Sequence, residues 1–272
     1  MPKPDPKRQP ESAWLGALFI WIAGYVDAIG YITLFHVYAA NMSGNSVSLA
    51  INSAQTDWRL AFAHACPILA FFPGLIAGAS IVKACKMARF RTALLPSMIF
   101  EAGILILFVR GAHHYGFDDL SKPAVYNSIY VMAIGLLAFA MGVQNGALRE
   151  ISGLKSIHTY VTGTLLSAAD ECTTFFFWLI RRLTHRPKSR WRRLSRYIHR
   201  QPELRVGCYS LLLWCLYVCG GIAGALLLLH LGIASMFVAV IALLITGLFD
   251  LFLPLAHYPE RSRASSRRRS ES

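Results

Sequence analysis

A short polar motif occurs twice in this chain, each time at the head of a short apolar run. The first copy is Ser43-Gly44-Asn45 and the second is Thr162-Gly163-Thr164. In both copies a hydroxyl residue, a glycine and a small polar residue lead about 10–12 mostly apolar residues, roughly half of what a membrane-crossing helix needs. The motif therefore predicts two half-helices, at 43–55 and 162–180.

Long uncharged runs surround these motifs and indicate an integral membrane protein. Hydrophobic residues make up 55% of the chain and charged residues only 15%. Segments 124–143 and 207–229 contain no Asp, Glu, Lys or Arg and are long enough to cross a bilayer as helices. We expect an all-α membrane protein with six transmembrane helices. They are placed near 12–34, 59–82, 92–109, 124–143, 206–229 and 233–255.

The net charge of +13 raises the question of nucleic-acid binding, but its distribution argues for a membrane. Basic residues gather beside the apolar runs, which is the pattern of cytoplasmic loops. We therefore expect the lipid bilayer as a partner, with anionic lipids at the basic loops. Nucleic acid is not expected, because no recognition motif accompanies the charge. The basic segments are 1–13, 83–91, 181–206 and 257–272.

The two halves of the chain also repeat in order. The aligned pairs are Asp27 with Asn145, Gly44 with Gly163, and Gly74 with Gly220. The residues of the first two pairs are almost equally far apart in the sequence, and those of the third pair are further apart. One insertion explains the difference. The basic segment 181–206 is long enough to supply it. The glycines four residues apart, in 74–78 and 220–224, predict close helix contacts.

The positive-inside rule gives the repeat a direction. If the basic segments are cytoplasmic, 162–180 must enter the membrane and return, because a full crossing would place the bases of 181–206 outside. Each half then has three spans and one re-entrant half-helix. Because three is odd, the halves point in opposite directions, as in transporters with inverted repeats. The sequence predicts 3+3 inverted-topology repeats with both termini in the cytoplasm.

The same reasoning divides the chain into segments. The ends are expected to be disordered tails, and the two repeats are joined by an external linker. The segments are a cytoplasmic tail at 1–11, repeat 1 at 12–110, the linker at 111–123, repeat 2 at 124–256 with a cytoplasmic loop at 181–206, and a basic tail at 257–272.

The start of each half-helix is a candidate binding site. Backbone N–H groups and the positive end of the helix dipole face the cavity there. Ser43 and Thr162 suit the N-cap position, and Gly44 and Gly163 let a ligand approach the backbone. The functional interpretation is a site for a polar or anionic group, or a water path. The alternative is simple capping of buried helix ends.

Two carboxylates, Asp27 and Glu101, lie within predicted spans. Such groups are costly in lipid and indicate function, since a buried carboxylate can carry a proton. The alternative is a structural hydrogen bond, for Glu101 to Asn45 or Thr164. Asn145 cannot titrate, so any proton coupling would be asymmetric. The predicted substrate or ion path consists of Asp27, Asn41, Ser43, Gly44, Asn45, Glu101, Gln144, Asn145, Thr162, Gly163 and Thr164.

Signatures of enzymes and cofactors are missing from the sequence. There is no H-E-x-x-H, G-x-S-x-G, Walker or G-x-G-x-x-G motif. The six cysteines form no C-x-x-C pair, and no His stands at ligand spacing. We therefore expect no enzymatic activity, no cofactor and no metal, and we expect the cysteines to be buried small residues.

The motifs resemble those of the YoaK family of bacterial membrane proteins. That family carries a G-x-x-D-A motif, here Gly24–Ala28, followed by a T-G-N motif, here Ser43–Asn45. The second half resembles the same pair at Met141–Asn145 and Thr159–Gly163. The resemblance covers about residues 14–256 and differs from the family in having Ser43 for the usual Thr. It implies a multi-pass protein of the bacterial cytoplasmic membrane, in a family of unknown function, and supplies no substrate.

Three functions are open at this point. The first is a small secondary transporter, proton-coupled or not, of a small polar or anionic solute. The second is a passive channel with paired half-helices. The third is a membrane component without transport activity that docks a partner through 181–206. A homo-oligomer is compatible with all three.

Overall fold

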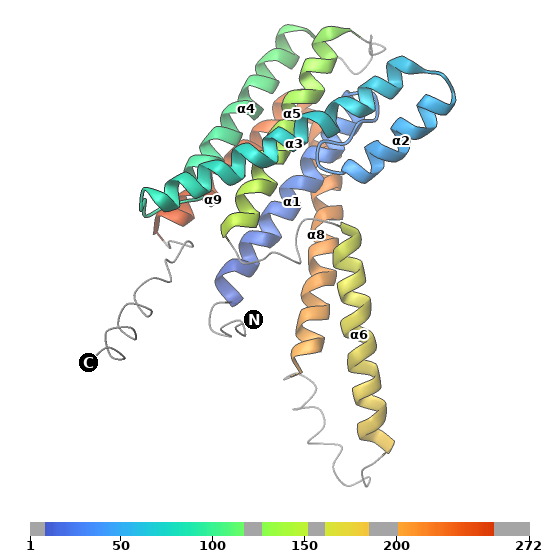
Figure 1. The fold of residues 1–272 in the computed structure, drawn as a ribbon, viewed down its shortest axis with the longest axis vertical. Coiled ribbons are helices and arrows are strands. Elements are labelled where there is room, and N and C mark those ends of the chain that lie inside the picture. The colour runs from blue at the N-terminus through green and yellow to red at the C-terminus, as the bar shows by residue number, and fades with distance from the viewer. Residues whose placement is uncertain (1–8, 117–126, 152–160, 185–200, 253–272) are drawn as a thin grey trace, which may run out of the picture.

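A computed structural model describes residues 9–116, 127–151, 161–184 and 201–252, and every regular element in these ranges is a helix (Figure 1). Most of the predicted linker and basic loop, and the tail from 257, lie outside the described residues. The elements are α1 (Gln9–Thr33), α2 (Met42–Ala54), α3 (Trp58–Met87), α4 (Leu95–His114), α5 (Ser128–Ile151), α6 (Val161–Thr184), α8 (Pro202–Leu231), the 3-10 helix η2 (Gly232–Met236) and α9 (Phe237–Phe252).

Among the described residues, five helical stretches are long and apolar enough to cross a bilayer. Four of them lie in α1, α3, α4 and α5, and the fifth, Glu203–Phe252, contains α8, η2 and α9. Gly232 has a left-handed φ of 60°, which lets the chain turn after α8. The prediction of an all-α membrane protein is confirmed at this level.

Two helix pairs pack backbone against backbone at glycines. Between α3 and α5, a Cβ added at Gly74 would lie 2.4 Å from the Phe139 carbonyl oxygen. Between α1 and α8, a Cβ added at Gly220 would lie 2.1 Å from the Trp21 carbonyl oxygen. No larger residue fits without separating the helices, so the glycine spacing has the close-packing role that the sequence predicted.

The contacts of the two pairs follow the sequence alignment. Gly78 faces the Val143 carbonyl at the α3–α5 interface, and Gly224 faces the Tyr25 carbonyl at the α1–α8 interface. Tyr25 and Val143 have the same separation as the aligned Asp27 and Asn145. Each glycine-packed pair therefore joins one helix from each half of the chain.

The helices that carry the two motifs differ in length. α2 has 13 residues and packs beside α3, whereas α6 has 24 residues and packs beside α8. In Figure 1 the two helices run from the middle of the molecule toward opposite ends. The predicted half-helix at 162–180 is therefore too short. Asp170 is exposed on the surface of α6 and Glu171 is half-buried, so neither residue interrupts the helix.

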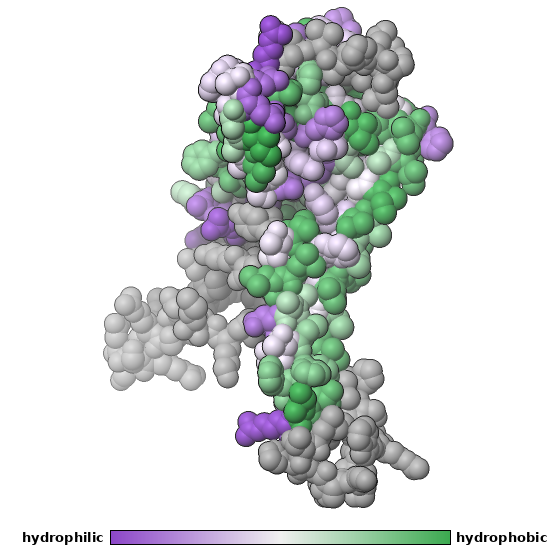
Figure 2. All heavy atoms as spheres, turned by 90° about the vertical axis from the view of Figure 1, so that its right-hand side faces the viewer, coloured by the Kyte–Doolittle hydropathy of each residue, from purple (hydrophilic) through white to green (hydrophobic). Residues whose placement is uncertain are grey.

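Apolar side chains cover much of the outer surface, as expected for a face in contact with lipid. Figure 2 shows them over α6 and α8 on the side that faces the viewer. The prediction that the cysteines are buried is wrong for most of them, because only Cys85 is buried and four are exposed. A cysteine on the outer face of a membrane-spanning helix contacts lipid, so it avoids water without being buried inside the protein. The exposed cysteines are Cys172, Cys208, Cys215 and Cys219.

Candidate functional site

Asp27 lies in α1 beneath the loop that leads into α2, and only 3% of its surface is exposed. Its Oδ1 accepts a hydrogen bond from the Ala40 amide at 2.6 Å, and its Oδ2 accepts one from the Tyr217 hydroxyl at 2.7 Å. The amides of Ala39 and Asn41 also donate to the carboxylate. Asp27 thus ties the loop and α8 to α1, and these donors compensate a buried charge.

The loop between α1 and α2 is a tight reversal. Phe35 and His36 both have left-handed φ values, 50° and 58°, which are uncommon for residues other than glycine. Asn45 holds the loop from the other side, because its Oδ1 accepts from the Tyr38 amide at 3.0 Å and its Nδ2 donates to the Tyr38 carbonyl at 2.7 Å. The last residue of the first motif is therefore a structural tie in this conformation.

The start of α2 is capped by Asn41, so the prediction that Ser43 is the N-cap is wrong. The Asn41 Oδ1 accepts from the Gly44 amide at 3.2 Å and from the Ser43 hydroxyl at 2.8 Å. A Cβ on Gly44 would lie 3.0 Å from two ring carbons of Tyr38. Gly44 thus makes room for a tyrosine ring. Several donors predicted to face a ligand are already engaged within the protein.

Aromatic side chains surround the same loop. The ring of Tyr31 lies 5.0 Å from that of Tyr38 and 4.8 Å from that of His36, between ring centroids. Burial raises the pKa of the Tyr38 phenol, with smaller contributions from Tyr31 and Asp27. Neither Tyr38 nor Tyr217 was among the predicted site residues. A tyrosine within an apolar span is the only sequence signal for Tyr217.

The second motif forms bonds within its own helix. The Thr164 hydroxyl donates to the Val161 carbonyl at 2.7 Å. Because α6 begins at Val161, Thr162 lies within the first turn and is not the N-cap as predicted. Thr162 and Gly163 are exposed. The loop at 152–160, which would correspond to the loop before α2, lies outside the described residues.

The counterpart of Asp27 in α5, Asn145, is also held locally. Asn145 Nδ2 donates to the Met141 carbonyl at 2.8 Å, one turn earlier in the same helix. Gln144 is buried, and its Nε2 has no hydrogen-bond partner. The helix continues through both residues to Ile151 without a break.

Glu101 is fully buried in α4, and neither of its carboxylate oxygens has a hydrogen-bond partner. The predicted alternative, a bond to Asn45 or Thr164, is wrong because those side chains are bonded to Tyr38 and Val161. A buried carboxylate without donors is unusual and requires a compensating partner. Glu101 and Gln144 are thus the members of the predicted set with buried polar atoms that the hydrogen bonds of the fold do not satisfy, and Glu101 is the one that can carry a charge.

A third buried carboxylate, Asp250 of α9, was not among the predicted site residues. Its Oδ2 accepts from the Leu94 amide at 2.9 Å, at the start of α4. A carboxylate is favourable there because the helix N-terminus presents free N–H groups and positive charge. The contact spans 156 residues of sequence, so no local pattern indicated it.

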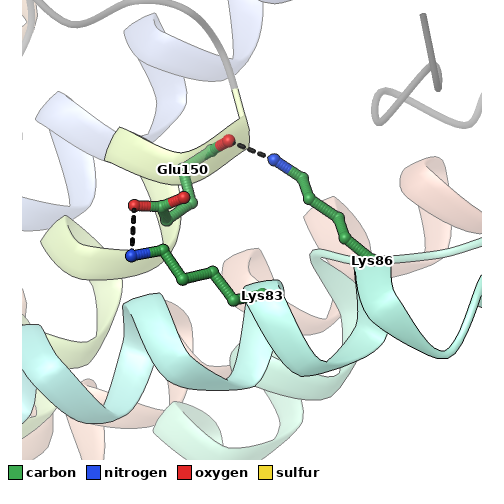
Figure 3. Close-up of polar contacts among 3 residues, drawn as sticks. All are labelled: Lys83, Lys86 and Glu150. Carbon is green, nitrogen blue, oxygen red and sulfur yellow. Dashed lines mark hydrogen bonds and ion pairs between the residues drawn. The ribbon is translucent and has the colours of Figure 1, made fainter. Parts of the chain in front are cut away.

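An ion pair fastens the last turns of α3 and α5 (Figure 3). Lys83 Nζ lies 3.4 Å from Glu150 Oε1, and Lys86 Nζ donates to the Glu150 carbonyl. The Lys83 side chain is 62% exposed, so the pair contributes little stability. It marks the end of the α3–α5 pair that borders the basic segment 83–91.

Apolar helices of membrane-crossing length, packed around buried carboxylates, define a multi-pass helical membrane protein. The family model described as protein of unknown function (DUF1275) matches residues 15–249, and the chain belongs to this family. The UPF0700 transmembrane protein YoaK of Bacillus subtilis (strain 168) is 29% identical over 164 residues, which cover 60% of this chain and 68% of that protein. The resemblance to YoaK is thus confirmed. No solved structure matches the chain.

Proposed function

We propose that this protein is a small secondary transporter built from two inverted repeats of three spans each. The observation that carries the proposal is the pair of matching glycine interfaces, α3–α5 and α1–α8, each of which joins the two halves of the chain. Inverted repeats that exchange helices around a central site are a transporter architecture.

In this proposal α1 corresponds to α5, α2 to α6, α3 to α8 and α4 to α9. The divergence of α2 and α6 toward opposite ends of the molecule supports the inversion (Figure 1). With three spans in each repeat and the basic segments inside, both termini lie in the cytoplasm of a bacterium. α2 and the longer α6 then enter the membrane from opposite sides.

The moving units are the two glycine-packed pairs. Backbone contact makes each pair stiff, because sliding one helix would press carbonyl oxygens into the opposite backbone. α1 and α5 share few contacts with each other, and the pairs are linked through α4, which packs on α5, and α9, which packs on α1 and on α4. Rocking of one pair against the other would expose the middle of the molecule to each side in turn.

The solute site lies at the head of α2, where Asp27, Asn41 and Asn45 organise the loop. Its counterpart is the exposed start of α6, at Thr162 and Gly163. The solute is small and polar or anionic, and Asp27 and Glu101 are the candidates for proton coupling. Anionic lipids bind at the basic segments.

The test begins with a ligand. Purified protein is screened against metabolites for a rise in melting temperature, because a ligand of the folded state stabilises it. Stabilising compounds are then tested for uptake into liposomes with and without a pH gradient. We expect saturable uptake that the gradient increases. As a control, Ser46→Ala, which removes an exposed hydroxyl bonded to its own helix, should leave uptake unchanged.

Two results would contradict the transporter. Uptake that neither saturates nor responds to the gradient would indicate a passive channel. No uptake of any stabilising compound, together with loss of cellular function on deletion of 185–200, would indicate a component that docks a partner.

A further inference from the structure

We infer that Glu101 is the cation-binding residue of this protein, with a proton or a sodium ion as the cation, and that Asp27 is a fixed tie. The cation site is argued from Glu101 and its surroundings alone. Its role in coupling rests on the proposed function.

The three buried carboxylates of the described residues differ in their partners. Asp27 accepts from backbone amides and from Tyr217, and Asp250 accepts from the Leu94 amide. Glu101 accepts nothing, although it is as deeply buried as Asp250. An isolated buried charge is strongly disfavoured, so Glu101 must take up a proton or hold a cation. Asp27 and Asp250 need neither, because donors already compensate them.

The interior of the described part offers Glu101 no basic partner. Its buried carboxylic acids and bases are three carboxylates and one histidine, His64, and no Lys or Arg is buried among these residues. The histidine Nδ1 itself lacks a hydrogen-bond partner. A buried carboxylate with no strong base in the surrounding interior favours a cation over an anion as the species that binds to it.

Groups on the neighbouring helices do not compensate Glu101 either. α4 packs against α3, α5, η2 and α9, and η2 has no titratable residue. None of the titratable or charged side chains of the other three helices forms a hydrogen bond or ion pair with the Glu101 carboxylate. These side chains are Arg59, His64, Cys66, Lys83, Cys85, Lys86, Tyr130, Arg149, Glu150 and Asp250.

The immediate surroundings of Glu101 are apolar. Met98, Leu105 and Phe108 lie on the same face of α4 and are almost completely buried. A proton needs no further ligands in such a place, whereas sodium would need additional oxygen atoms. The Ser235 hydroxyl, which is buried without a partner in η2, is an oxygen on an element packed against α4. The experiment therefore includes one arm for each cation.

The test compares the wild type with Glu101→Gln, Glu101→Asp and Asp27→Asn in lipid nanodiscs. Infrared spectra are recorded across a pH titration in potassium buffer, and melting temperatures are recorded with added sodium or potassium. For a proton, the wild type shows a carbonyl band of a protonated carboxylic acid that Glu101→Gln loses and Asp27→Asn keeps. For sodium, that band is absent, and sodium raises the melting temperature of the wild type but not of Glu101→Gln.

Two control variants separate loss of the cation site from loss of the fold. Glu101→Asp retains a carboxylate, so it should restore the band or the sodium effect even if the glutamine variant is poorly folded. Gly103→Ala, in the same helix with open space around the added methyl group, should behave as the wild type. The inference is overturned if neither the band nor the sodium effect depends on residue 101, or if the band is lost in Asp27→Asn instead.

The flux assay separates this inference from the proposed function. A band that follows Glu101 in a protein that transports nothing would uphold the cation site and reject the transporter. Gradient-driven flux that is unchanged in Glu101→Gln would uphold the transporter and reject the role of Glu101 in coupling.

Discussion

The α1–α8 and α3–α5 pairs have the same backbone contacts but different polar groups. Gly24 faces the carbonyl of Tyr217 in one pair, and Gly142 faces that of Phe71 in the other. The hydroxyl of Tyr217 reaches Asp27, whereas Phe71 has no hydroxyl, and among the described residues Asn145 bonds within its own helix. The repeated part is therefore the scaffold, and within the described part of the chain the tie to a loop is present in one pair, α1–α8.

This difference separates two demands on the sequence. Close backbone contact accepts glycine alone and is met in both pairs. The choice of polar side chains is less constrained, and the two pairs have different polar contacts. The loop tie through Asp27 belongs to α1–α8, and the ion pair of Lys83 with Glu150 belongs to α3–α5. The following substitutions test whether the glycine contacts that both pairs share contribute more stability than the polar contacts that differ between them.

The largest effect is expected where the pairs are alike. Gly78→Ala and Gly224→Ala would place a methyl group 2.0 Å and 2.5 Å from a backbone oxygen. Each should lower stability by about 2–4 kcal/mol, because the helices must separate. Thermal unfolding in detergent measures this loss. Gly103→Ala, which meets nothing within 4 Å, should be neutral or slightly stabilising. Equal stability of all three variants would show that the glycine contacts do not hold the helix pairs together.

Asp27→Ala and Asn145→Ala test where the pairs differ. Removing the aspartate leaves backbone amides and a buried hydroxyl without an acceptor, which costs about 2–3 kcal/mol. Removing the asparagine loses one bond within a helix, and about 1 kcal/mol is expected. Unfolding midpoints under the same conditions give the comparison. If both alanine variants lost the same stability, the asymmetry between the pairs would be unsupported.

Asn41→Ala removes the cap of α2. The two hydrogen bonds that its side chain accepts would be lost, and a loss of about 1 kcal/mol is expected. Ser43→Ala should cost less, because Ser43 is exposed and donates only to Asn41. Thermal unfolding of the two variants is compared with that of the wild type. A larger loss of stability for Ser43→Ala than for Asn41→Ala would indicate that Ser43 is the N-cap of α2.

The smallest effect is expected at the ion pair. Glu150→Gln should change stability by less than about 1 kcal/mol, since Lys83 is largely exposed and solvent screens the pair. The difference from the wild type should shrink further in high salt. Unfolding measured at low and high ionic strength checks both points. A large difference that persists in salt would show that the end of α3–α5 depends on this contact.

The features that the sequence predicted best are those with a strict local requirement. The glycines of α3 and α8 could be aligned because only glycine allows helices so close. The cap of α2 was misassigned to Ser43, because Asn41 two residues earlier is an equally good capping residue. The length of α6 was underestimated, because residues 181–184 lie in the helix although they were assigned to the basic loop.

Long-range polar contacts could not be predicted. The bond from Tyr217 to Asp27 joins residues 190 apart, and that from Leu94 to Asp250 joins residues 156 apart. Neither distance leaves a periodic signal in the sequence. The sequence did single out Asp27 and Glu101 as costly groups in a span, but it did not distinguish the compensated carboxylate from the uncompensated one.

The inversion of the two halves can be tested by labelling single cysteines in a background without the native ones. Gln55→Cys lies just after α2, and Arg181→Cys lies in the last turn of α6, both at exposed positions. A membrane-impermeant maleimide should label Gln55→Cys in intact cells and Arg181→Cys only after the membrane is permeabilised. Labelling of both from the same side would contradict the inverted arrangement and the transporter built on it.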